Sequence, residues 1–97
     1  MRYIRVQWIH SHTDEPVMLY SEVDSQGWEV RKVEIFADGR IGFASENEAV
    51  GSSELGEKPV PSQEEIAADQ QFRPAEISKE EFEAVWLRRR SPARSTG

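Results

Sequence analysis

The sequence predicts an α+β fold: a four-stranded, mostly antiparallel sheet, connected as a meander and covered on one face by a C-terminal amphipathic helix. Three observations predict it. Apolar and polar residues alternate along residues 3–43, as in strands with one buried face. The period becomes helical in residues 78–90. The length of 97 residues fits one domain with one modest core.

The first two predicted strands span residues 3–12 and 17–23, and a four-residue turn ending in glycine closes the second. A single antiparallel sheet needs a cover to bury one face. The apolar face of the strands is therefore expected to lie under the helix. The residues expected on it are Ile4, Val6, Trp8, Leu19 and Val30.

The third and fourth predicted strands span residues 28–36 and 41–43. Val30 and Val33 fall on opposite parities, so we predict a β-bulge near residues 31–32 that restores a single core face. A strand buried on both sides is the alternative. An Asp-Gly pair between the two runs is a strong hairpin signal.

Residues 45–58 predict a long acidic surface loop, because they are rich in Ser, Glu and Gly. Val50 and Leu55 are the apolar residues at which this loop is expected to dock. The domain as a whole is expected to span residues 1–90, and residues 91–97 are expected to form a disordered tail.

Two capping-box patterns predict two helices. Ser62 with Glu65 predicts a short one, and Ser78 with Glu81 predicts the C-terminal one. Residues 72–77 between them are expected to form an extended connector. The apolar residues at helical spacing in the C-terminal helix are Phe82, Val85 and Trp86.

The net charge of −6 is unevenly spread along the chain. Residues 1–44 carry −2, residues 45–87 carry −8 and residues 88–97 carry +4. A field of that sign repels phosphate backbones and attracts a basic partner. We therefore expect no general nucleic-acid binding. A solvated acidic face that only maintains solubility is the alternative.

The absence of cysteine excludes disulfides, thiolate catalysis and cysteine-ligated zinc, and it is typical of a reducing compartment. The N-terminus lacks a signal-peptide pattern, and no apolar stretch approaches the roughly 20 residues that span a bilayer. We therefore expect a soluble cytoplasmic protein that does not bind membranes.

Two histidines and two carboxylates follow the first apolar strand, at its mouth. Histidines two apart on a strand share one face, and a nearby carboxylate could complete a site for zinc or ferrous ion. In the structural alternative, His10 packs at the edge of the core while His12 and Asp14 tie the turn by hydrogen bonds. The candidate ligand-binding residues, with two polar contacts from neighbouring strands, are His10, His12, Asp14, Glu15, Tyr20 and Arg31.

The outer face of the predicted sheet, away from the helix, carries polar side chains on adjacent strands. In one interpretation these side chains form cross-strand pairs, each worth roughly 0.2 to 1 kcal/mol. In the other they form a surface that recognises a partner. The residues expected on this face are Arg5, Gln7, Tyr20, Glu22, Glu29 and Arg31.

No pattern fixes an activity. The chain has no Gly-x-Ser-x-Gly nucleophile turn and no Gly-x-x-x-x-Gly-Lys phosphate loop. A histidine paired with a glutamate would suit acid–base catalysis, but nothing in the sequence favours one pair. We assign no catalytic residue, no metal ligand and no cofactor.

Three phrases of the sequence are distinctive: MRYIRVQWIHSH at residues 1–12, RKVEIFADGRIG at residues 31–42 and ISKEEF at residues 77–82. With them the chain resembles a family of small uncharacterised bacterial proteins over residues 1–90. The resemblance implies a bacterial origin, and it brings no activity, cofactor or site residue.

We therefore expect a non-catalytic binding protein, such as a small acidic inhibitor or immunity-type protein that covers a basic protein partner. Complementary charge would speed association and help to select that partner. The expected partner-binding residues are Glu46, Glu48, Glu54, Glu57, Glu64, Glu65 and Asp69. The alternative is a small-molecule or metal-binding module that uses the mouth from His10 to Glu15.

Overall fold

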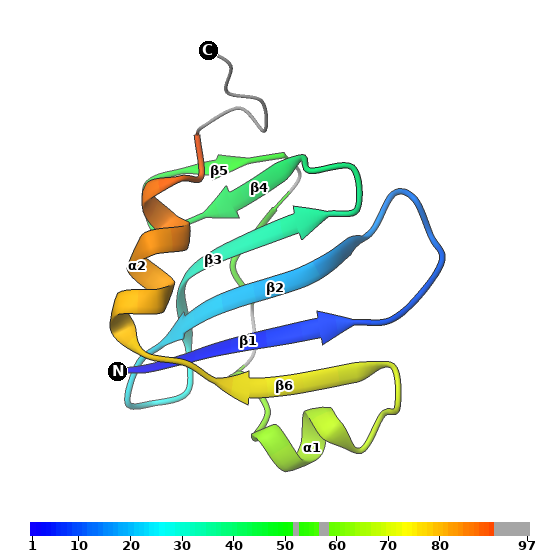
Figure 1. Ribbon diagram of the computed structural model, residues 1–97. Coiled ribbons are helices and arrows are strands. Elements are labelled where there is room, and N and C mark those ends of the chain that lie inside the picture. Colours follow the sequence, from blue (N-terminus) through cyan, green and yellow to red (C-terminus); the bar gives the residue numbers. More distant parts are fainter. Residues whose placement is uncertain (52, 57–58, 91–97) are drawn as a thin grey trace.

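A computed structural model describes residues 1–51, 53–56 and 59–90 (Figure 1). It is an α+β fold with an antiparallel sheet and two helices, as the sequence predicts. The predicted disordered tail, residues 91–97, lies outside the described residues.

The sheet has six strands, so the prediction of four was wrong. Their order across the sheet is β5-β4-β3-β2-β1-β6. The strands are β1 (Arg2–Trp8), β2 (Pro16–Val23), β3 (Glu29–Phe36), β4 (Ile41–Ala44), β5 (Ala49–Val50) and β6 (Phe72–Glu76). The helices are α1 (Gln63–Ala67) and α2 (Lys79–Leu87). Strands β1 to β5 follow one another as a meander, and β6 returns to the free edge of β1.

Strand β6 occupies most of the predicted connector. It pairs antiparallel with β1, from Ile4 opposite Glu76 to Trp8 opposite Phe72. Pro74 within this run argues against a strand in the sequence, because proline cannot donate to a ladder; an edge strand tolerates it. Strand β5 has only two residues inside the predicted loop, which is too short for a periodic signal.

The predicted β-bulge is present at Val30. Glu22 pairs with Arg31, but the next residue of β2, Val23, pairs with Glu29, so Val30 is the extra residue of β3. The bulge places Glu29 and Arg31 on opposite faces of the sheet, although a regular strand would put them on the same face. Val33 is thereby directed into the core.

The turns that flank β3 depend on aspartate and glycine. Asp24 accepts hydrogen bonds from the backbone amides of Gln26 and Trp28, each at 2.9 Å. Gly27 and Gly39 have φ of 89° and 92°, a region that L side chains rarely adopt. These two positions hold the sheet in register at both ends of β3.

Helix α2 packs on the face that carries Tyr3 and Arg5, although Arg5 was expected on the face away from the helix. The Tyr3 and Phe82 rings lie 5.5 Å apart, and Arg5 reaches Glu81 at 2.9 Å. Ser78 caps α2 through the Glu81 amide, but the Glu81 carboxylate bonds to Arg5, so the predicted capping box is only half formed. The expectation that Ile4, Val6, Trp8 and Leu19 face the helix was wrong.

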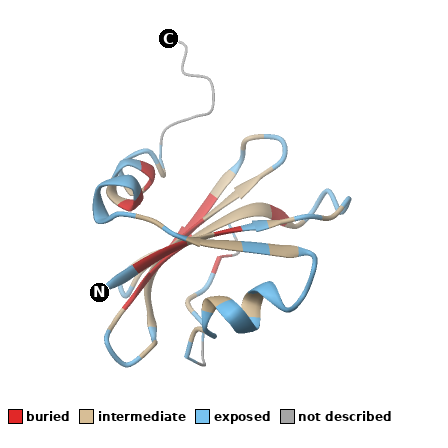
Figure 2. Cartoon of the chain, turned by 60° about the horizontal axis from the view of Figure 1, so that its bottom comes forward, coloured by how far each residue is buried: buried red, intermediate tan, exposed pale blue. Residues whose placement is uncertain are grey.

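The physical reason is that both faces of the sheet are covered. The core on the α2 side is built from Val33, Phe43 and Val85, with Tyr20, Ile35, Ile41 and Trp86 packed against it. On the other side Ile4, Val23 and Ala44 are no more than 2% exposed. Figure 2 shows the buried residues along the central strands, between α2 and the part of the chain that contains α1. Parity alone does not say which of two buried faces meets the helix.

The α2 face is the side of the sheet with Tyr3, Tyr20, Arg31, Val33 and Phe43. The groove face is the opposite side, with Ile4, Val6, Leu19, Ser21 and Glu29.

Candidate functional site

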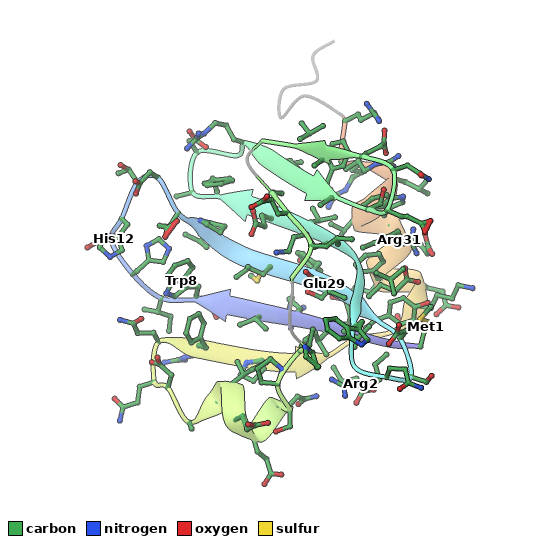
Figure 3. The ribbon with its side chains drawn as sticks, turned by 180° about the vertical axis from the view of Figure 1, so that it is seen from behind. Met1, Arg2, Trp8, His12, Glu29 and Arg31 are labelled. Atoms are coloured by element: carbon green, nitrogen blue, oxygen red, sulfur yellow. The ribbon has the colours of Figure 1, made fainter. Side chains whose placement is uncertain are left out.

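A groove of about 840 Å³ lies between the groove face and the chain that covers it. This volume is within the range of ligand-binding clefts, roughly 300 to 1,000 Å³. Its floor is Ile4, Val6 and Leu19 from β1 and β2. Figure 3 looks onto this side of the sheet, where residues 53–56 cross in front of the strands.

The walls come from the segment before α1, from α1 and from the start of β6. Their apolar residues are Leu55, Pro59, Val60, Pro61, Ile66 and Phe72. The remaining lining residues are Ser21, Glu29, Glu54, Gly56, Glu65 and Asp69. These fifteen residues are called the acidic groove.

Local contacts fix the covering chain. The Val60 amide donates to the Gly27 carbonyl at 2.6 Å, which attaches it to the turn between β2 and β3. The predicted capping box of α1 is present in both halves, with Ser62 bonded to the Glu65 amide and Glu65 bonded to the Ser62 amide. A short helix needs such caps, because its end amides have no partner within it.

Two carboxylates on the groove face hold residues 53–56, called the cover, against the sheet. Glu29 accepts hydrogen bonds from the Ser21 hydroxyl at 2.7 Å and from the Gly56 amide at 2.9 Å. Glu34 accepts one from the Ser53 hydroxyl at 2.6 Å. Lys32 lies between them, with its Nζ 3.4 Å from Glu29 and 3.8 Å from Glu34. Buried charges need such pairing, so this cluster stabilises the cover in place.

The rim of the groove is acidic. Every charged residue among its described lining residues is a carboxylate: Glu29, Glu54, Glu65 and Asp69. Glu54, Glu65 and Asp69 are exposed, as is Glu64 beside them on α1. None of these four exposed carboxylates forms an ion pair with a described basic residue. Their field therefore extends into solvent and favours a cation at the groove.

On the α2 face, charges are paired and enclosed. Arg31 binds Glu22 at 2.5 Å and Glu83 at 2.6 Å, and its guanidinium carbon lies 4.9 Å from the ring centroids of both Phe82 and Trp86. Hydrogen bonds from Arg31 hold the pKa of both carboxyls below their usual value. Burial, with a hydrogen bond to Glu22, raises the pKa of Tyr3.

The structure does not bring the six candidate ligand-binding residues together. Tyr20 and Arg31 lie on the α2 face, half-buried, while the histidines lie in the loop after β1. Both ring nitrogens of His10 are engaged: Nε2 with the Pro16 carbonyl at 2.7 Å, and Nδ1 with the His12 amide at 2.9 Å. His10 thus ties the loop, a role that was expected of His12 and Asp14.

The carboxylates of that loop, Asp14 and Glu15, complete no cluster. Among the described residues, no group of three or more His, Asp or Glu side chains is placed to hold a metal ion. The mouth of the sheet therefore offers fewer ligands to a metal than the sequence suggests.

The expected partner-binding residues divide into three groups. Glu54, Glu65 and Asp69 line the acidic groove, and Glu64 is beside it. Glu46 and Glu48 lie between β4 and β5, where Glu48 pairs with Arg89 at 3.4 Å and with Arg90. Glu57 lies outside the described residues.

The sequence did not predict the floor of the groove, because its residues were expected to lie on the sheet face that the C-terminal helix covers. A usable signal was present: Val60, Ile66 and Phe72 are apolar residues of the second half of the chain that needed a surface to pack on.

Among the residues that the structure describes, no helix has the length and apolar character that a membrane-spanning helix requires.

A family model described as a domain of unknown function, DUF6881, matches residues 2–91. No curated protein matches the chain, and no solved structure does.

Proposed function

The chain belongs to the DUF6881 family, described as a domain of unknown function, and we propose from its geometry that it is a non-catalytic binding domain for a basic protein partner. The partner sits over the acidic groove and the neighbouring Glu64. The role that suits such a domain is that of a small acidic inhibitor or immunity-type protein in the bacterial cytoplasm, in keeping with a chain without cysteine.

One observation carries the proposal: exposed carboxylates without a described basic partner gather around an apolar groove. Elsewhere in the described chain, the carboxylates of Glu22, Glu81 and Glu83 each lie against an arginine. A solvated acidic face needs no apolar floor beneath it. An interface does, because apolar contact supplies affinity while charge supplies rate and selectivity.

The proposal is tested by capture followed by measurement. The immobilised protein is expected to retain a basic protein from a bacterial lysate at low salt. The affinity between the two purified proteins should then fall steeply as the salt concentration rises, because screening reduces the attraction between charged surfaces. An affinity that does not change with salt would contradict the proposal.

A matched pair of variants makes the test specific. The Glu54→Lys, Glu65→Lys, Asp69→Lys triple variant should lose the partner. Glu46→Lys reverses the charge of an exposed residue between β4 and β5, outside the groove lining, and should retain it. Equal binding by both variants would place the partner elsewhere.

A further inference from the structure

We propose that the occupant of the acidic groove is a short partner segment with apolar residues in its middle and a lysine or arginine at each end. This inference rests on the proposed function and specifies the chemistry that the groove recognises. It follows from the order in which the lining residues occur along the strands.

The strand register gives that order. Ile4 pairs with Ser21, whose hydroxyl bonds to Glu29, and Glu29 also holds the amide of Gly56, two residues after Glu54. One end of the groove is therefore marked by the exposed carboxylate of Glu54, next to the segment that Glu29 anchors.

The middle of the groove is apolar. Val6 pairs with Leu19 across β1 and β2, and both line the floor. The apolar wall residues, including Val60 and Ile66, line the same groove. Side chains of an occupant placed here would remove this surface from water, which is favourable in proportion to the apolar area buried.

The other end is marked by Asp69. Trp8 pairs with Phe72 in β6, and the Phe72 amide donates to the Asp69 carbonyl at 3.0 Å. The Asp69 carboxylate accepts a hydrogen bond from the Gln71 amide at 2.9 Å, so it stays at this turn. The two acidic ends are thus separated by the strand from Ile4 to Trp8, which is about 13 Å at the rise of a β-strand.

Charge complementarity selects the occupant. A span of about 13 Å corresponds to roughly four residues of extended chain. Two cationic side chains that far apart, with apolar residues between them, match the carboxylates at both ends and the floor between them. A segment with acidic ends would meet like charge at both ends.

The test uses three capped pentapeptides as probes. Lys-Leu-Val-Leu-Lys has the proposed pattern, Leu-Lys-Val-Lys-Leu has the same composition in another order, and Glu-Leu-Val-Leu-Glu reverses the terminal charges. Binding to the full chain is followed by amide chemical shifts. The first peptide should shift the amides of residues 4–6, 19–21 and 54–56. It should bind at least about tenfold more tightly than the second peptide. The third peptide should not bind.

Variants separate the floor from the rim. Leu19→Lys places a cation on the floor and should lower the affinity for the first peptide at least about tenfold. Leu87→Lys adds the same charge at an exposed position of α2 and should leave that affinity unchanged. Glu54→Lys with Asp69→Lys should abolish binding. Circular dichroism of each variant checks that it is folded.

Several outcomes would overturn the inference. Equal binding of the two lysine peptides, or an unaffected Leu19→Lys variant, would mean that only the rim is used; the proposed function would then survive on its capture experiment. Shifts at the groove amides that depend on protein concentration alone would identify a second copy of the chain as the occupant. No shift at these amides with any peptide would remove the inference and leave the capture result to decide the function.

Discussion

The two faces of the sheet carry similar residue types but use them differently. On the α2 face, Arg31 forms ion pairs with two carboxylates, and its guanidinium lies over two aromatic rings. On the groove face, Glu54, Glu65 and Asp69 are exposed beside an apolar groove whose lining includes the half-buried Leu19, Val60 and Ile66. The α2 face is closed by its own side chains. The groove face has charge and apolar surface left for a partner.

The comparison shows that the number of charges on a face says little about its role. What matters is whether each charge has a partner within the fold. Paired charges of the α2 face contribute to stability, and their removal should unfold the domain more readily. The groove-rim charges should contribute little to stability and much to binding.

The largest difference should appear on truncating one side chain from each face. Phe82 is fully buried and packs against the rings of Tyr3 and Trp86, so Phe82→Ala should cost about 3 to 5 kcal/mol of unfolding free energy. Leu19→Ala, on the half-buried floor, should cost only about 1 kcal/mol. Urea unfolding of both variants measures this. Equal costs would mean that Leu19 is part of the core.

The paired charges should give the next largest effect. Glu22→Gln weakens the contacts with Arg31 and Tyr3 in a buried site, and about 2 kcal/mol of stability should be lost at neutral pH. Glu76→Gln, an exposed change on β6, should lie within about 0.5 kcal/mol of the parent.

The same variant should change the pH dependence. The folded-state pKa of Glu22 is below its ordinary value of 4.5, so its stabilisation is present above pH 4.5 and is lost as the pH falls through the folded pKa. The stability gap between the parent and Glu22→Gln should therefore close in acid. A gap that stays constant from pH 7 to pH 2 would contradict this role for Glu22.

The anchors of the cover should have a smaller effect. Ser53→Ala removes the hydroxyl that binds Glu34, and about 1 to 1.5 kcal/mol should be lost. The amides of residues 53–56 should then exchange with solvent faster, since the cover is held less firmly. Ser25→Ala, in the exposed turn before β3, is the control. Unchanged exchange in Ser53→Ala would show that this bond does not hold the cover.

The histidine loop should give the smallest effect. His10→Ala removes two hydrogen bonds of a mostly exposed loop and should cost about 0.5 to 1 kcal/mol. His12→Ala should cost less, because His12 contributes its backbone amide to that bond. Thermal unfolding compares them. A rise in melting temperature on adding zinc, lost in both variants, would instead support the metal-binding alternative.

Much of the fold could be predicted from the sequence where the signal is local. The Asp-Gly turn, the parity change around Val30 and the Ser62 capping box are each set by neighbouring residues, and all three are present. Strand β6 could not be predicted, because Pro74 argues against a strand and only the free edge of β1 makes it one.

The site was predictable in part for a similar reason. Acidic composition pointed to Glu54, Glu65 and Asp69, which do line one groove. The floor depends on which face α2 covers, and that choice is made by contacts distant in the sequence, such as Arg5 with Glu81. Periodicity contains no information about it.

The most direct test of the account is amide hydrogen exchange of the protein alone and with its captured basic partner. We predict slower exchange in residues 4–6, 19–21, 54–56 and 60–69 on binding, with no change in α2. Protection confined to α2 and the strand residues beneath it, with the groove unchanged, would contradict the assignment of the groove face as the binding surface.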